Sequence, residues 1–330
     1  FVNGSGQQQC VGGTSIGGGA MFATSVNTMS VLGSFGSLVF ENNSMVFSCN
    51  SFTLASGQQG QQYSARGVDC GGGALYFGTL SLSVDVIQSL FVGNSIRSSG
   101  QGFEVRNDGQ IIPVSFSQSS GGGATFVSSG FVQFSTCTWR ENKVIAKLQS
   151  NVISTDGKYG GGALFCGGYC TFFNSQFVQN AIPGDVALSG GGILGNLVNI
   201  QNSTFSGNSA HSGGGVAVFS PLLRSTLMNQ FSWTTFSNND AIQGGAVYTG
   251  PTSQGSISSC FLFDNVGLQF GGAMFMSGSW TLHLAEFSYN VASETGGDIY
   301  FSGLASVVTF QFFVSSCLFY GSKTTFAGGS

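Results

Sequence analysis

The chain has 330 residues, of which 53 are glycine, 32 are phenylalanine and only 4 are proline, and 7% of them are charged. A chain this rich in apolar residues has enough apolar surface to bury, which excludes a disordered chain. The absence of a heptad pattern excludes a coiled coil. The net charge is −4 and the nine basic residues are scattered, which argues against nucleic acid and anionic membranes as partners. No stretch reaches the roughly 18 uninterrupted apolar residues of a membrane span, so we expect no transmembrane segment.

A two-part motif recurs nine times along the chain. Its first part is a pair or triplet of glycines followed by one further residue, at Ala20, Ala74, Ala124, Ala163, Ile193, Val216, Ala246, Ala273 and Asp298. These signals lie 54, 50, 39, 30, 23, 30, 27 and 25 residues apart, and the shortest spacing is about what three strands and three turns need. A unit that repeats in this way buries its apolar face by stacking on copies of itself, which predicts a solenoid.

The second part of the motif is an aromatic-x-x-Asn tetrad that follows each glycine signal. Its aromatic members, which we expect to stack in one inward column, are Phe40, Phe91, Trp139, Phe177, Phe205, Phe236, Phe287 and, in a degraded last copy, Phe319; Leu262 takes this place in the seventh copy. Its asparagines are Asn43, Asn94, Asn142, Asn180, Asn208, Asn239, Asn265 and Asn290. Asparagine tolerates the left-handed conformation and bonds backbone at turns, so we interpret this ladder as structural, bonded to its own turn and to the neighbouring coil.

Further columns appear when residues are counted from these landmarks. The position eight residues before each asparagine is apolar in all nine copies: Phe35, Val86, Phe134, Phe172, Ile200, Phe231, Ile257, Leu282 and Val314. Five residues before the asparagine lies a mostly small residue that faces the same way as the tetrad aromatic: Leu38, Ser89, Cys137, Ser175, Ser203, Thr234, Cys260, Ala285 and Cys317. Two residues after each glycine signal lies a third column: Phe22, Tyr76, Phe126, Phe165, Gly195, Val218, Tyr248, Phe275 and Tyr300.

These columns predict three short period-2 segments per unit, separated by bends. We therefore expect an all-β fold, a single-stranded, right-handed parallel β-helix of about nine to ten three-strand coils. Residues 1–330 form one domain, in which residues 1–16 are a candidate N-terminal cap. Insertions at about 54–70, 97–120 and 146–159 interrupt the first coils and are expected on the surface as loops or extra hairpins.

The ends of the sequence suggest a longer assembly. The chain begins at Phe1 without Met or a signal peptide, so we expect a processed form or an excerpt. Gly328 and Gly329 follow Ser322 at the spacing that opens each coil, and resemble the start of a tenth. We therefore expect the C-terminal edge to be covered by further coils of a longer polypeptide or by the next subunit of a head-to-tail filament.

The eight cysteines fall into groups by position. Cys137, Cys260 and Cys317 occupy the small inward column, where we expect buried thiols. The C-x3-C spacing of Cys166 and Cys170 is compatible with a small disulfide loop and not with a paired zinc knuckle. Whether a second bridge joins Cys49 and Cys70 across the base of the first insertion is left open by the sequence, and Cys10 has no evident partner.

Three sequons, at Asn3, Asn42 and Asn202, are candidates for N-glycosylation. Together with the cysteine pairs they favour an extracellular or cell-surface location.

The glycine and tetrad motifs resemble the repeats of the chlamydial polymorphic outer-membrane proteins. GGGAMF from Gly17, GGGALY from Gly71 and GGGALF from Gly160 carry the likeness, with FVGN from Phe91 and FVQN from Phe177. The same repeats occur in predicted surface proteins of protists, algae and other bacteria. The resemblance covers nearly the whole chain and implies a β-helical architecture, a surface setting and an adhesin-like role.

The alternative from another class is a β-helical carbohydrate-active enzyme, a polysaccharide lyase or hydrolase. Such an enzyme needs clustered carboxylates or acidic calcium ligands with a basic residue beside them. Only Asp240 with Asp264, and Glu294 with Asp298, come near each other in the repeat register, and neither pair has a basic partner. His211 and His283 are solitary.

We therefore assign no catalytic, cofactor-binding or metal-binding residues and expect no enzyme. The glycine pairs match neither the G-x-x-x-x-G-K-[ST] phosphate-binding loop nor a G-x-G-x-x-G motif that opens a helix. We interpret them as bend residues. The expected function is that of an extracellular structural or adhesive protein, part of a longer surface protein or a filament. Its partners would be copies of itself, end to end or side by side, or other surface proteins and glycans.

Overall fold

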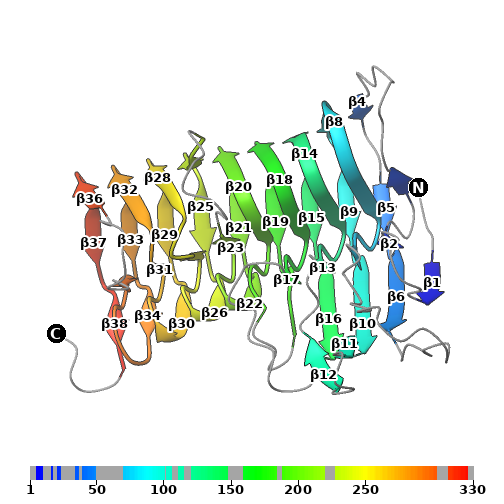
Figure 1. The fold of residues 1–330 in the computed structure, drawn as a ribbon. Coiled ribbons are helices and arrows are strands. Elements are labelled where there is room, and N and C mark those ends of the chain that lie inside the picture. Colours follow the sequence, from blue (N-terminus) through cyan, green and yellow to red (C-terminus); the bar gives the residue numbers. More distant parts are fainter. Residues whose placement is uncertain are drawn as a thin grey trace.

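The chain folds into a parallel β-helix (Figure 1). The structure is a computed structural model that describes residues 5–9, 16–17, 21–23, 34–36, 39–49, 70–100, 102–105, 111–114, 120–147, 159–183, 188–219, 227–302 and 311–325. Every regular element within these ranges is a β-strand, and each complete coil contributes to three parallel sheets. The coils stack along one axis from the N-terminal to the C-terminal end of the chain (Figure 1). The predicted fold class is confirmed.

The first sheet, here the tetrad sheet, contains one three-residue strand from each tetrad. Its nine parallel strands are β5 (Val39–Glu41), β9 (Leu90–Val92), β15 (Thr138–Arg140), β19 (Gln176–Val178), β21 (Thr204–Ser206), β25 (Thr235–Ser237), β29 (Phe261–Phe263), β33 (Glu286–Ser288) and β37 (Leu318–Tyr320). The pairing places each tetrad aromatic beside its counterpart in the next coil, with Leu262 between Phe236 and Phe287. One motif therefore corresponds to one coil.

The second sheet, here the long sheet, contains the residues after each glycine signal together with those before each tetrad. They run together in β8 (Leu75–Ile87), β14 (Thr125–Ser135), β18 (Leu164–Phe173) and β20 (Ile193–Gln201). In the other coils they separate into β3 (Met21–Ala23), β23 (Val216–Val218), β27 (Val247–Thr249), β31 (Met274–Met276) and β35 (Ile299–Phe301), and into β4 (Ser34–Gly36), β24 (Asn229–Ser232), β28 (Gln254–Ser258), β32 (Ser279–His283) and β36 (Phe312–Ser315).

The register of the long sheet confirms the apolar column eight residues before each asparagine, from Phe35 opposite Val86 to Leu282 opposite Val314. Two of the three predicted segments, however, lie in this one sheet and are not separate sides of the coil. The prediction treated them as separate because a bend was expected between them, whereas in four coils the strand continues through.

The third side of the coil begins directly after each ladder asparagine and was not predicted. This post-asparagine sheet consists of β1 (Ser5–Gln9), β6 (Ser44–Cys49), β10 (Ser95–Gly100) and β16 (Lys143–Lys147), and of β22 (Ser209–Ser212), β26 (Asp240–Gln243), β30 (Val266–Phe270), β34 (Val291–Ala292) and β38 (Lys323–Thr324). Bridges through Ala181 connect Lys143 to Ser209. The sequence feature that could have predicted this sheet is an apolar residue two positions after the asparagine. It is buried in Ile96, Val144, Ile182, Ala210, Ala241 and Ala292.

Smaller elements fill in the N-terminal half. β1 pairs in parallel with β6, so residues 5–9 of the candidate cap add a strand to the post-asparagine sheet. The short strands β2 (Ile16–Gly17), β7 (Cys70–Gly71), β13 (Ser120–Gly121) and β17 (Tyr159–Gly160) pair with one another, and each ends at the first glycine of a glycine triplet. Within the second insertion, β11 (Gly102–Val105) and β12 (Ile111–Val114) form an antiparallel hairpin. Residues 54–69 and 148–158 of the other insertions lie outside the described residues.

Left-handed residues form both corners of the tetrad sheet. One lies immediately before the asparagine position: Asn42, Gly93, Glu141, Gln179, Gly207, Asn238, Asp264, Tyr289 and Gly321. The other lies six residues before it: Gln88, Thr136, Asn174, Asn202, Trp233, Ser259, Leu284 and Ser316. The ladder asparagines themselves have no positive φ, so their tolerance of the left-handed conformation is not what places them at the bend. The left-handed residue turns the chain, and the asparagine that follows it can therefore point inward.

The small residue five positions before the asparagine lies in the corner, directly after the first left-handed residue, and not on the tetrad strand as predicted. Its side chain is nevertheless buried, as predicted, in Ser89, Cys137, Ser175, Ser203, Thr234, Cys260 and Ala285.

The structure corrects the alignment of two glycine signals. In the fourth, fifth and sixth coils one glycine of the signal has a φ between 63° and 73°, namely Gly161 (73°), Gly190 (73°) and Gly213 (63°), and Ile193 pairs with Leu164 rather than with Ala163. The signal ends two residues after this glycine. The signals of the fifth and sixth coils therefore end at Gly192 and Gly215, one residue earlier than predicted. The glycine that follows the left-handed one permits close stacking, since a Cβ at Gly162 would lie 2.2 Å from the carbonyl oxygen of Gly191 in the next coil.

The corrected third column is Tyr76, Phe126, Phe165, Leu194, Ala217, Tyr248, Phe275 and Tyr300; the predicted Gly195 and Val218 belong to the adjacent position. Its neighbours Leu75 and Phe77 lie in the main core, whereas Tyr76 belongs to a separate apolar cluster with Phe126 and Phe165. Because side chains alternate along a strand, this column lies on the outer face of the long sheet.

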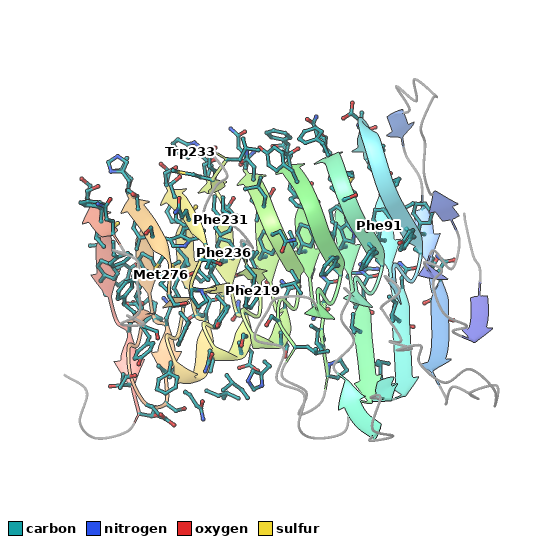
Figure 2. The ribbon with its side chains drawn as sticks, viewed as in Figure 1. Phe91, Phe219, Phe231, Trp233, Phe236 and Met276 are labelled. Atoms are coloured by element: carbon teal, nitrogen blue, oxygen red, sulfur yellow. A yellow bond between two sulfur atoms is a disulfide. The ribbon has the colours of Figure 1, made fainter. Side chains whose placement is uncertain are left out.

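The tetrad aromatics from Phe40 to Phe236 form one ring stack inside the helix, of which Phe91 and Phe236 are labelled in Figure 2. Ring centroids are 4.5 Å apart between Trp139 and Phe177 and 4.6 Å apart between Phe177 and Phe205, with interplanar angles of 4° and 2°. Parallel pairing at one fixed register places identical positions at the strand spacing of about 4.8 Å, which suits offset ring stacking.

Removal of one ring from this stack should be costly. Phe205→Ala deletes a fully buried side chain that stacks on Phe177 and Phe236. We expect it to lower the free energy of unfolding by about 3 to 5 kcal/mol in denaturant titrations. Gln201→Ala, which changes an exposed side chain of the same coil, should stay within about 0.5 kcal/mol of the wild type. Equal losses from the two variants would contradict this account of the core.

Candidate functional site

The asparagine ladder is the most regular polar feature of the molecule. From Asn43 to Asn265, each backbone N–H and each Nδ2 donates to the Oδ1 of the next asparagine, over 2.8 to 3.1 Å. From Asn94 onward, each Nδ2 also donates to the backbone carbonyl three residues before the asparagine of the preceding coil, as Asn208 does to Phe177 at 2.9 Å. From Asn94 onward these bonds join each asparagine to both neighbouring coils, and the expected bond to a neighbouring coil's backbone is present. These bonds do not include the predicted one to the asparagine's own turn.

This ladder is closed to ligands. All eight asparagines are fully buried, with 0% exposure. Each interior Nδ2 uses both of its protons and each interior Oδ1 accepts two bonds. A ligand would have to displace bonds that already satisfy buried polar groups, which is costly. The arrangement supports the structural interpretation of the ladder over a binding site.

The C-terminal end of the ladder is completed by different chemistry. In the ninth coil Ser322 stands where an asparagine would, and its Oγ accepts the backbone N–H of Asn290 at 3.3 Å. Asp298 Oδ1 accepts the bond from Asn290 Nδ2 at 2.8 Å and a further bond from Ser322 Oγ. The Asp298 carboxylate therefore accepts the bond that the amide oxygen of an asparagine at position 322 would accept. Burial raises the pKa of Asp298 above 3.8, and the bonds from Ser322 and Asn290 partly offset that rise.

The other carboxylates considered for catalysis are dispersed. Asp240 pairs with Val266 in the post-asparagine sheet, whereas Asp264 lies in the corner before Asn265, so the ladder corner separates them. Burial raises the pKa of Asp240. Glu294 is exposed, whereas Asp298 is taken up by the end of the ladder. The described residues include no group of three or more His, Cys, Asp or Glu side chains that could hold a metal ion.

The remaining polar candidates have local roles. His283 is exposed, and its Nδ1 lies 2.9 Å from Ser315 Oγ. His211 is partly buried, and the loss of solvation lowers its pKa. Glu141 forms an exposed ion pair with Arg140 at 3.5 Å, a kind of contact that adds little stability.

The cysteines divide into a disulfide and buried thiols. Cys166 and Cys170 are joined by a disulfide, with their Cα atoms 6.3 Å apart. Burial raises the pKa of Cys137 to about 11 and that of Cys260 to about 12, so neither thiol is a ready nucleophile at neutral pH. Cys317 was also predicted to be a buried thiol, but it is partly exposed, because no described coil covers the ninth coil. The side chains of Cys49 and Cys70, and all of Cys10, lie outside the described residues.

Two of the three sequons occupy exposed corners. Asn42 and Asn202 both have positive φ and exposed side chains, and Asn202 Nδ2 donates to Asn174 Oδ1 at 2.7 Å. Asn3 lies outside the described residues.

The comparisons with known proteins leave the family open. No family model, curated protein or solved structure matches this chain. Within the described residues, no helix is long and apolar enough to cross a membrane.

The structure also reveals a surface feature that the sequence analysis did not identify. Trp233, Phe261, Tyr289 and Tyr320 are exposed aromatic side chains on four successive coils, from the sixth to the ninth. They belong to the tetrad strands or their corners but point outward. The sequence could have indicated this feature, because these aromatic residues stand at positions that are polar or glycine in most other coils.

Removing one ladder asparagine should lower the free energy of unfolding about as much as removing one core ring. Asn208→Ala removes the acceptor of the Asn180 N–H and the donor to the Phe177 carbonyl, and both groups remain buried. We expect a loss of about 2 to 5 kcal/mol in the free energy of unfolding, measured by denaturation. Gln230→Ala, which changes an exposed side chain of β24 in the adjacent coil, is the control. A change below about 0.5 kcal/mol in Asn208→Ala would show that the ladder is not a stabilising network.

The end of the ladder should give stability an unusual pH dependence. Because the folded-state pKa of Asp298 is raised, its protonation stabilises the fold below that pKa, and this contribution is lost as the pH rises through it. Asp298→Asn keeps an Oδ1 acceptor and carries no charge. We therefore expect the unfolding free energy of the variant, relative to wild type, to rise between pH 3.8 and neutrality. Denaturation across this pH range tests it, and a constant or falling difference would contradict the assignment.

Proposed function

We propose that this protein is a non-enzymatic, extracellular structural or adhesive β-helix that is extended by stacking, either within a longer surface protein or as a filament subunit. The observation that carries the proposal is the ninth coil, which continues the repeated columns but leaves them uncovered. Val314 is 46% exposed and Phe319 is 44% exposed, whereas their counterparts Leu282 and Phe287 in the eighth coil are fully buried.

The ninth coil also presents unpaired strands. Within the described residues, β36, β37 and β38 each pair with the eighth coil on one side only. Exposed apolar strand edges recruit further strands unless they are capped. Stacking one more coil would bury Val314 and Phe319 and pair these edges, as happens at every other step of the repeat. A contact of this head-to-tail kind propagates into a filament if the next body is another copy.

The remainder of the proposal rests on the internal use of the repeats. The ring stacks and the asparagine ladder serve packing, and the described carboxylates do not converge as acid–base chemistry would need. The extracellular, surface setting is supported by the likeness to polymorphic outer-membrane repeats and by the exposed sequons at Asn42 and Asn202.

Self-association of the 330-residue chain tests the proposal. We expect sedimentation velocity to show association that grows with concentration. Val314→Lys together with Phe319→Lys places charges on the open coil, and should leave the chain monomeric without changing its folded spectrum. Gln176→Lys, at an exposed position of the fourth coil, should associate as the wild type does. A wild-type chain that stays monomeric at the highest concentration, with a stable ninth coil, would overturn the stacking proposal.

A further inference from the structure

Four exposed aromatic side chains follow one another across the outer face of the tetrad sheet. Trp233 (63% exposed) lies at the corner where the sixth coil enters this sheet, and Phe261 (47%) lies on β29 of the seventh coil. Tyr289 (56%) lies at the corner where the eighth coil leaves the sheet, and Tyr320 (41%) ends β37 of the ninth. The rings of Tyr289 and Tyr320 meet edge to face at 5.5 Å. We call these four residues the aromatic row.

Folding does not account for two members of the row. Trp233 and Tyr289 have left-handed φ values of 53° and 54°. Such a conformation costs an aromatic residue free energy that glycine or asparagine largely avoids. At the corner of Tyr289 the other coils have Asn42, Gly93, Glu141, Gln179, Gly207, Asn238, Asp264 and Gly321. Trp233 and Tyr289 remain more than half exposed, so burial offsets little of this conformational cost. Figure 2 shows Trp233 at the outer margin of its coil, with Phe231 and Phe236 inside.

The composition around the row indicates the kind of partner. The segments of these four coils from the first corner to the second are residues 233–238, 259–264, 284–289 and 316–321, and they contain no basic residue. Their charges are Asp264 and Glu286, and Glu286 Oε1 accepts the Tyr320 hydroxyl at 2.7 Å. Thr235, which pairs with Phe261, presents a partly exposed hydroxyl on this face, whereas the hydroxyl of Ser288 is buried. An anionic partner would be repelled here, whereas an uncharged partner rich in hydroxyl groups meets both aromatic faces and hydrogen-bonding groups.

We propose that the aromatic row binds a neutral glycan chain. Sugar rings present C–H groups that pack on aromatic faces and hydroxyls that bond to the partly exposed side chains of Glu286 and Thr235. Adjacent coils are about 4.8 Å apart, so two coils span about 10 Å, close to one disaccharide of an extended glycan. The four coils of the row therefore provide a footprint of one to two disaccharides. This proposal names the ligand class for the adhesive part of the proposed function and rests on it, and it does not depend on stacking at the ninth coil.

Trp233 provides a direct probe of binding. The chain has three tryptophans, and Trp139 and Trp280 are buried, so fluorescence accessible to a soluble quencher comes from Trp233. We expect soluble oligosaccharides of neutral β-linked glucose or N-acetylglucosamine to shift its emission and to protect it from iodide. The chain should also be retained on insoluble cellulose or chitin. Sialylated and sulfated glycans should neither shift the emission nor retain the chain.

The variants separate recognition from folding. Trp233→Asn with Tyr289→Asn replaces both corner aromatics by a residue that suits their backbone conformation. It should keep or raise the melting temperature and weaken retention on the neutral glycan at least tenfold. Gln88→Asn with Gln179→Asn, at the equivalent corners of the second and fourth coils, is the matched control and should bind as wild type.

Several outcomes would overturn the proposal. They are the absence of binding to any neutral glycan, unchanged binding by the double variant, and selective binding of anionic glycans. Loss of self-association in the double variant, without glycan binding by wild type, would assign the row to a contact between copies instead. The wild type could fail to bind glycans while Val314→Lys with Phe319→Lys still abolishes self-association. That result would reject the glycan ligand and leave the stacking proposal intact.

Discussion

Side-chain hydrogen bonding along the asparagine ladder is the constraint on which the rest of the structure depends. Each interior asparagine bonds two neighbouring coils at once, to the Oδ1 of one and to the backbone carbonyl of the other. A slip of one residue between coils would break several of these buried bonds and would turn the tetrad strand's inward side chain outward. The ladder therefore holds coils of very different lengths to one register. The ring stacks at Phe177 and Phe205 follow from that register.

The corners explain how inward and outward residues are kept apart. Two left-handed residues per coil bend the chain on either side of a three-residue strand, and the residue after each of them points inward. The corners themselves carry outward side chains that the core does not constrain. Such corner positions can acquire surface functions without disturbing the fold. Trp233 and Tyr289 lie at two of these corners. The same division separates an interior that is fully occupied by packing from an outer face on which recognition is proposed.

The sequence predicted the inward columns well because each coil repeats them at a fixed distance from the asparagine. The column from Phe35 to Val314 is in register throughout. The third side of the coil was missed because its inward residue varies from Ile96 to Ala210 and no polar landmark follows it. The glycine signals at Ile193 and Val216 were misplaced by one residue, since a glycine triplet does not show which glycine has the positive φ. Asp298 was read as a signal residue because its partner Ser322 lies a full coil away. The exposed aromatics looked like part of the abundant core phenylalanines and tyrosines until their corners were known.

Native-state amide hydrogen exchange of the ladder residues tests the central claim most directly. Each ladder N–H from Asn94 to Asn265 donates to a buried Oδ1 of the next coil. If the ladder fixes the register, these protons exchange only when the helix unfolds. Those of Asn142, Asn180, Asn208 and Asn239 should then share one opening free energy, equal to that of global unfolding. Exchange of these amides through local openings, at free energies well below global unfolding and different from coil to coil, would contradict the claim.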